Sequence, residues 1–168
     1  MSLPVLDPVP SAPRQQDLAD IARRVAAQGD LWIPRLRFTV EYRWYERLVE
    51  APDHEVWLLT WLPGQGTEIH DHGGSSGAFA VVRGELTERA FASAARRTDP
   101  SPWTLPAGSL RAFGPNHVHE VTNRGPEPVV SIHAYSPALT TMSYYRHTAG
   151  RVLELVRTDR VDAAGVRR

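Results

Sequence analysis

The chain has 168 residues, and its 19 basic and 19 acidic residues give a formal net charge of zero at pH 7. It contains no cysteine, which excludes disulfides and thiolate metal ligands, so any metal must be bound by nitrogen and oxygen atoms. The balanced charge argues against nucleic acid or an anionic membrane as the main partner, because no overall electrostatic attraction is available.

The N-terminal part predicts an arm and one helix at the start of a single domain spanning 1–168. Residues 1–13 contain four prolines and should form an extended arm. Residues 14–29 predict an amphipathic helix, because apolar residues from Leu18 to Ala26 recur at helical spacing and Gly29 is a plausible end. The chain start lacks a signal-peptide pattern and no apolar run is long enough for a membrane span, so we expect a cytoplasmic protein.

From Phe38 onward the pattern changes to short strands separated by turns. Clusters such as LPGQG, GGSSG, FGPN and NRGPEP interrupt segments rich in β-branched and aromatic residues. Many short strands at this spacing predict an all-β barrel or sandwich over residues 38–148, followed by a tail over 149–168 with no assigned function. The predicted strands are residues 43–49, 56–62, 67–72, 78–83, 86–92, 103–105, 109–113, 118–122, 129–135 and 141–147.

The stretch from residue 61 to residue 88 contains two histidines, His70 and His72, separated by a single residue. In a strand, side chains at positions i and i+2 point to the same face, so these two imidazoles can bind one ion together. The many glycines around them allow tight turns and a close approach of the backbone to a bound group. The pair therefore predicts part of a metal site inside a barrel.

A second histidine pair, His117 and His119, supplies further candidate ligands. Only one of the two needs to face the barrel interior, and their spacing does not decide which. Further along, Ser131, His133 and Tyr135 alternate on one face of a predicted strand. Tyr135 on such an apolar strand is interpreted either as a core aromatic residue or as part of a site.

The first histidine stretch resembles the first motif of the cupin superfamily, G-x5-H-x-H-x4-E-x6-G. The match uses Gly64, His70, His72 and Gly84, and Gly77 stands where the motif has its glutamate. This resemblance implies an all-β fold, a cupin-type β-barrel (jelly-roll) with an N-terminal helical segment.

The second stretch resembles the second cupin motif, which ends H-x3-N and matches His119 and Asn123. The resemblance thus selects His119 rather than His117. More narrowly, the runs YERLV, IHDH, HEVTN and SIHAYSP resemble the cysteine dioxygenases of the bacterial kind, from about Arg43 to Met142.

This resemblance implies Fe(2+) as the cofactor, with His70, His72 and His119 as its three ligands. Most mononuclear iron oxygenases use two histidines and one carboxylate. A third neutral imidazole in place of the carboxylate leaves the site with the full charge of the ion, which suits an anionic thiolate as incoming ligand. Three facial nitrogens leave three open positions, enough for a bidentate substrate and O2.

The resemblance also implies residues that bind and orient the substrate. Arg47 matches the arginine that binds the substrate carboxylate, for which a planar guanidinium is well shaped, and Tyr45 matches the tyrosine that accompanies it. Tyr135 matches the active-site tyrosine. His133 and Ser131 match the hydrogen-bonded residues that fix the orientation of its phenol.

Some positions differ from the mammalian members of this family. In those members a cysteine at the position of Gly77 is crosslinked to the tyrosine, so Tyr135 is expected to act here as a free phenol. Met142 stands where mammalian enzymes have another pocket cysteine. Ser136–Pro137 matches a serine–proline bond that is cis in the family.

The expected function is the oxidation of the small-molecule thiol L-cysteine by O2 to cysteine sulfinate. Dioxygenases of 3-mercaptopropionate carry glutamine at the arginine's position, so Arg47 favours cysteine over that or another small thiol. A non-enzymatic metal-binding cupin is an alternative of another class. A cupin isomerase or hydrolase would need an inward carboxylate; Glu68 and Asp71 are the nearest candidates, and strand alternation directs Asp71, between the two histidines, away from the metal. The oligomeric state stays open, and a monomer is compatible with the sequence.

Overall fold

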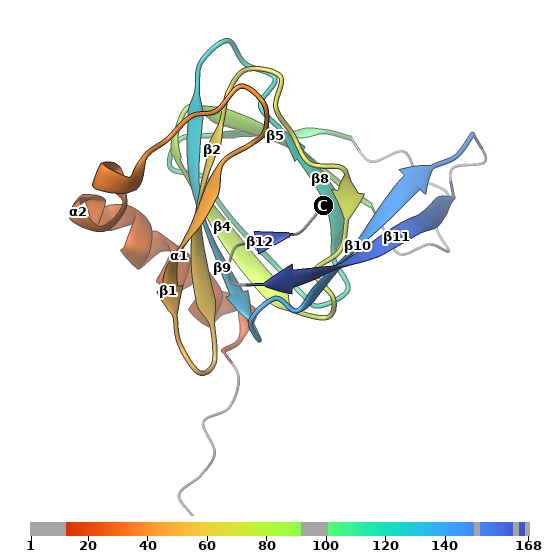
Figure 1. The fold of residues 1–168 in the computed structure, drawn as a ribbon, viewed down its shortest axis with the longest axis horizontal. Helices are drawn as coiled ribbons and strands as arrows, with labels where there is room; N and C mark the ends of the chain where they lie inside the picture. Colours follow the sequence, from red (N-terminus) through yellow and green to blue (C-terminus); the bar gives the residue numbers. More distant parts are fainter. Residues whose placement is uncertain (1–12, 92–100, 150–151, 163–164, 167–168) are drawn as a thin grey trace, which may run out of the picture.

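The computed structural model describes residues 13–91, 101–149, 152–162 and 165–166, whose strands form two antiparallel sheets facing each other as a barrel (Figure 1). This architecture confirms the predicted all-β fold. Each of the ten predicted strands overlaps an observed strand. In spatial order, the first sheet contains β1 (Tyr45–Glu50), β2 (Glu55–Trp61), β9 (Val129–Ser136), β4 (Ser76–Arg83) and β7 (Leu110–Phe113).

The second sheet holds the other seven described strands. It includes part of the C-terminal segment 149–168, for which the sequence predicts only a tail. A long strand in this segment pairs with the strand before it, over the register Thr141↔Arg160 to His147↔Leu153. In spatial order this sheet contains β12 (Gly165–Val166), β11 (Leu153–Asp162), β10 (Thr141–His147), β3 (Ile69–His70), β8 (Val118–Thr122), β5 (Glu85–Phe91) and β6 (Trp103–Pro106).

The predicted N-terminal helix is present as α1 (Gln15–Ala27), on the outer face of the first sheet (Figure 1). It ends earlier than expected, because Gln28 caps it by donating its backbone N–H to the carbonyl of Val25. Gly29 instead begins α2 (Gly29–Trp32), which continues into the 3-10 helix η1 (Ile33–Arg35). Residues 1–12 of the predicted arm lie outside the described residues. None of the described helices is long and apolar enough to span a membrane.

The two faces of strand β9 have different surroundings: one packs against α1 and the other faces the barrel interior. Its eight residues are all buried, because α1 covers one face of the first sheet and the barrel interior lies on the other. Val130, Ile132 and Ala134 pack with the helix. Burial of a large apolar side chain stabilises the fold by roughly 1.5–3 kcal/mol. The alternate residues, including His133 and Tyr135, are therefore directed into the barrel.

The turn after His72 needs glycine for a specific reason. Gly73 has φ of 59°, and a Cβ atom there would lie 2.5 Å from the carbonyl oxygen of Thr141. Its N–H donates a hydrogen bond of 2.9 Å to Oδ1 of Asp71, which also accepts one from the backbone N–H of Ser143. This turn fixes the position of His72, which lies beyond the short strand β3.

Candidate metal centre and active site

Three histidines from two neighbouring strands meet inside the barrel. His70 in β3 is the direct cross-strand partner of His119 in β8, and His72 follows two residues after His70. One ring nitrogen from each lies within 4.8 Å of the others, and all three residues are buried. The structure therefore brings together the three residues predicted as metal ligands.

The hydrogen bonds of these histidines leave one nitrogen of each available to an ion. Nδ1–H of His70 donates to the carbonyl oxygen of Glu68 at 2.8 Å, and Nδ1–H of His119 donates to Oε1 of Glu88 at 2.8 Å. Both ring nitrogens of His72 are buried without a partner among the described residues. Buried polar atoms are rarely left unpaired, and a metal ion would satisfy one of them.

The electrostatic environment keeps the three imidazoles neutral, which is the form that binds metals. Burial lowers the pKa of His70 well below its ordinary value, and the neighbouring His119 lowers it further. Burial also lowers the pKa of His72 well below its ordinary value, and its neighbours His70 and His119 lower it further. The pKa of His119 is also lowered, chiefly by burial, although its bond to Glu88 acts in the opposite direction.

Glu88 is a buried carboxylate that the sequence analysis did not identify. Its Oε2 accepts a hydrogen bond of 2.6 Å from Nε of Arg111, and its Oε1 lies 3.1 Å from Nε2 of His117 as well as bonding His119. Burial alone would raise the pKa of Glu88, but these hydrogen bonds outweigh burial and hold it well below its ordinary value. The ionised carboxylate thus orients His119. His117, the histidine that the motif did not select, supports this carboxylate.

The space beside Gly77 is filled by an aromatic ring. A Cβ atom at Gly77 would lie 2.5 Å from Phe113, so no side chain fits there while that ring keeps its place. Phe113 also stacks on His72, with ring centroids 4.9 Å apart and an interplanar angle of 24°. Phe113 therefore occupies the region where the cupin motif would direct a glutamate, and it holds the imidazole of His72 in place.

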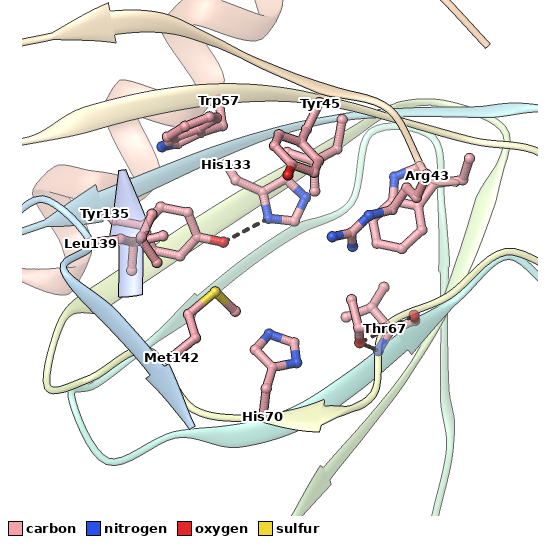
Figure 2. A pocket seen from close by; sticks show the side chains of 13 residues that line it. Arg43, Tyr45, Trp57, Thr67, His70, His133, Tyr135, Leu139 and Met142 are labelled. Carbon is pink, nitrogen blue, oxygen red and sulfur yellow. Dashed lines mark hydrogen bonds between the residues drawn. The ribbon is translucent and has the colours of Figure 1, made fainter. Parts of the chain in front are cut away.

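A cavity of about 70 Å³ adjoins the histidines (Figure 2). His70 lies on one wall, and much of the remaining lining comes from segments distant in the sequence, including Val161 of β11. A larger outer hollow of about 800 Å³ shares several lining residues with it, among them Arg43, His70 and Met142. The outer hollow therefore adjoins the cavity at these shared residues.

Tyr135 lines this cavity and ends a chain of hydrogen bonds that begins at Trp61. Nε1–H of Trp61 donates to Oγ of Ser131 at 2.9 Å, and the serine hydroxyl can in turn donate to Nε2 of His133, 2.9 Å away. A neutral His133 then carries its proton on Nδ1, 3.3 Å from the phenol oxygen of Tyr135. The tyrosine proton is left to point at another acceptor.

Burial explains why this chain stays uncharged. It lowers the pKa of His133 well below its ordinary value, and the cationic Arg43 lowers it further. Burial raises the pKa of the Tyr135 phenol strongly. Tyr135 is therefore a proton donor and not a phenolate. With Gly77 beside it and no cysteine in the chain, the phenol is also free of a thioether.

Arg47 is not among the described residues that line the cavity. Its guanidinium lies 2.8 Å from the carboxylate of Glu50 and 3.5 Å from that of Glu55. Its Cζ lies 5.7 Å from the ring centre of Trp57, its cross-strand partner, and Trp57 itself lines the cavity. Of this cross-strand pair, Trp57 and not Arg47 therefore lines the space where a substrate would bind.

The structure places a different arginine, Arg43, at the cavity. It lines both the cavity and the outer hollow, with its Cζ 4.5 Å from the ring centre of Trp61 (Figure 2). Tyr45, predicted beside the substrate, also lines both spaces. Alternation on one strand face could have suggested Arg43, since it precedes Tyr45 by two residues just as Arg47 follows it by two.

Three other motif residues have clear places. Ser136–Pro137 is a cis peptide bond, as in the family that the sequence resembles. Met142 lines the cavity. Asn123 is fully buried away from it, where its side-chain amide donates to the carbonyl oxygens of Trp61 and Glu127 and holds the turn after β8.

The solved structures similar to this chain share its fold. An uncharacterised protein of Klebsiella pneumoniae with a double-stranded β-helix domain superposes with a TM-score of 0.54 and 23% identity, over 62% of this chain and 80% of its own. An RmlC-like cupin protein of Desulfovibrio desulfuricans gives a TM-score of 0.52 and 16% identity, over 62% of this chain and 91% of its own. The barrel is therefore a cupin fold, as predicted.

The sequence comparisons identify the family within that fold. Human cysteine dioxygenase type 1 is 28% identical over 122 residues, which cover 66% of this chain. The matched part spans 59% of the human protein's length. The family described as cysteine dioxygenase type I matches residues 15–148, from the start of α1 to just beyond β10. This chain therefore belongs to the cysteine dioxygenase type I family.

Proposed function

We propose that this protein is a thiol dioxygenase that converts L-cysteine and O2 to cysteine sulfinate, with Fe(2+) as its cofactor. The observation that carries the proposal is the convergence of three available imidazole nitrogens beside a small cavity that an arginine lines. Membership of the cysteine dioxygenase type I family supports the same chemistry.

The residues fit a ferrous ion in number and in chemistry. His70, His72 and His119 would hold it through neutral nitrogens, and the carboxylate of Glu88 would orient His119 from behind. A ferrous ion bound there would supply O2 activation and bring the thiol and O2 together. The part of the protein in this proposal is to bind the substrate, orient it and control its protons.

Arg43 is the residue proposed to bind the substrate carboxylate. A guanidinium can donate two parallel hydrogen bonds to a carboxylate, and Arg43 lies where the cavity meets the outer hollow. Tyr45 lines the same region and offers a hydroxyl group. Arg47, expected in this role from the sequence, would instead keep the buried carboxylate of Glu55 paired.

Tyr135 is proposed to donate its phenol proton to the bound thiol or to an oxygen atom beside it. The Trp61–Ser131–His133 chain supports this role, because in the tautomer with the proton on Nδ1 of His133 each group donates toward the tyrosine and leaves its hydroxyl proton free. The raised pKa of Tyr135 keeps that proton in place at neutral pH.

The direct test measures O2 consumption and product by the ferrous-loaded protein with L-cysteine, using labelled O2. We expect cysteine sulfinate carrying two labelled oxygen atoms, and metal-free protein is the control. A protein that binds iron and L-cysteine without consuming O2 would overturn the proposal and favour a non-enzymatic metal-binding cupin.

A related dioxygenase that uses 3-mercaptopropionate or another small thiol is the second candidate. It is favoured by the position of Arg47. The preference for cysteine depended on that residue, and Arg47 packs on Trp57 without lining the cavity. Arg43 can bind the carboxylate of either thiol. The ratio of kcat/KM for L-cysteine to that for 3-mercaptopropionate decides between the two substrates.

A further inference from the structure

The indole N–H of Trp57 is a buried hydrogen-bond donor in the wall of the cavity. The residue is 5% exposed, and its Nε1 has no hydrogen-bond partner among the described residues. The other tryptophan in this wall, Trp61, is satisfied by its bond to Ser131. Buried donors without partners are uncommon in folded proteins, because removing them from water costs free energy that no bond returns.

Contacts on its ring hold this donor in a fixed orientation. Tyr45 meets the ring edge-on, with centroids 6.0 Å apart and an interplanar angle of 67°. The guanidinium of Arg47 lies over the ring, with its Cζ 5.7 Å from the ring centre, and is itself held by Glu50 and Glu55. The indole is thus oriented before any ligand arrives, which reduces the entropy lost on binding.

The chemistry of the cavity defines what this donor can bind. An indole nitrogen only donates, so its partner must be an acceptor. Two other polar groups that line the cavity, the guanidinium of Arg43 and the phenol of Tyr135, also suit negatively charged oxygen atoms. Figure 2 shows the indole nitrogen at the end of its ring nearer Tyr135 than Arg43, so this donor and the guanidinium of Arg43 lie at different parts of the cavity wall.

We propose that Trp57 is a specificity residue whose Nε1–H donates a hydrogen bond to an oxyanion oxygen of the bound ligand. The proposal rests on the proposed function, which supplies two such groups, the carboxylate of the substrate and the sulfinate of the product. It assigns Trp57 a role that the aligned motifs do not contain. It also gives Arg47 a role as a positioning residue, acting through the ring of Trp57.

The test compares wild-type protein with Trp57→Phe, which keeps an aromatic ring and removes the N–H group. Both proteins are loaded with Zn(II), which is diamagnetic and has no redox chemistry, so the protein does not turn over the thiols during the measurement. Binding is measured by calorimetry for L-cysteine, for cysteamine, which lacks the carboxylate, and for hypotaurine, which carries a sulfinate and no carboxylate.

A hydrogen bond to the carboxylate predicts that Trp57→Phe weakens binding of L-cysteine by about 10- to 100-fold while cysteamine affinity is unchanged. A bond to the sulfinate predicts the same loss for hypotaurine and an unchanged affinity for L-cysteine. Equal losses for all three ligands would indicate packing alone. Unchanged affinities would indicate that water satisfies the indole. Either of these last two results overturns the proposal.

A second measurement does not depend on the stability of the variant. The five tryptophans give five indole N–H signals in a ¹⁵N-labelled sample, and the signal of Trp57 is assigned by its contacts with the ring of Tyr45. We expect this signal to shift downfield when the oxyanion ligand is added. A Zn(II)-loaded protein that binds none of the thiols would contradict the proposed function, whereas normal binding without a shift would contradict the role of Trp57 alone.

Discussion

The two ends of the cavity are built in different ways. The metal end takes its three histidines from two short segments: the first places His70 and His72 by local spacing and the turn at Gly73, and the second places His119 opposite His70. The opposite end is assembled from β1, β2, the chain after β9 and the C-terminal strand β11, whose Val161 closes the wall. A site encoded locally can be recognised in a sequence, whereas one assembled across strands needs the fold.

Arg43 and Arg47 show the consequence most clearly. They stand four residues apart, each two residues from Tyr45. Their surroundings differ because Arg43 lies just before β1, beside the outer hollow, while Arg47 lies within β1 and is paired with Trp57. Equal spacing from Tyr45 therefore does not give equal access to a site.

The largest effect is expected from removing a ligand at the metal end. His119→Ala should weaken metal binding by more than the roughly 10- to 100-fold that loss of a supporting residue costs, and should abolish thiol oxidation. Metal affinity is measured by competition with a chelator. His54→Ala is the matched control, since His54 bonds Asp53 outside the cavity and its loss should leave the affinity unchanged. Equal affinities in wild type and His119→Ala would mean that the metal binds elsewhere.

The second prediction compares the two arginines at the substrate end. Arg43→Gln should lower kcat/KM for L-cysteine, because a charged hydrogen bond to the carboxylate is lost. The expected loss of transition-state stabilisation is about 1.5–3 kcal/mol. Arg47→Gln should have a smaller effect on kcat/KM and should lower the melting temperature, because Glu55 would keep a buried charge without its cation. A larger loss of kcat/KM in Arg47→Gln than in Arg43→Gln would show that Arg47 binds the substrate carboxylate.

The third prediction concerns the carboxylate behind the metal end. Glu88→Gln should weaken metal binding by about tenfold, because an amide orients Nδ1–H of His119 less strongly than a carboxylate does. Chelator competition measures this change, with Glu120→Gln as the control because Glu120 pairs with Arg89 instead. An unchanged affinity would show that β3 and β8 orient His119 without help from Glu88.

The smallest expected effect is a pH dependence of the free energy of unfolding that comes from His133. His133 is buried and its folded-state pKa lies well below the ordinary value, so the unfolded chain binds one more proton below about pH 6.5. Stability should therefore fall as the pH drops through this value, by about 1 kcal/mol at pH 5.5 for this residue. Denaturant unfolding of metal-free protein measures it. His133→Gln should lose less stability between pH 7.5 and 5.5 than wild type, and an equal loss would contradict the assignment.

Much of the fold could be predicted because its signals are periodic. The residues of β9 alternate between the helix-facing Ile132 and the barrel-facing His133, and the period of two survives whatever the strand packs against. The C-terminal strand β11 was missed, since its mixture of exposed apolar and charged residues lacks a clear alternation. Its place depends on pairing with β10, which the sequence of the tail does not encode by itself.

The sequence by itself determined the strands, the shared face of His70 and His72 and the alternation of Ser131, His133 and Tyr135, because each depends on spacing within one segment; the resemblance to the second cupin motif added His119. The tertiary structure alone decided that Arg43 and not Arg47 reaches the cavity, that Glu88 supports His119, and that Phe113 fills the space beside Gly77. Those contacts join residues from different strands. Register and ring packing set them, and neither can be read from the spacing of residues along the chain.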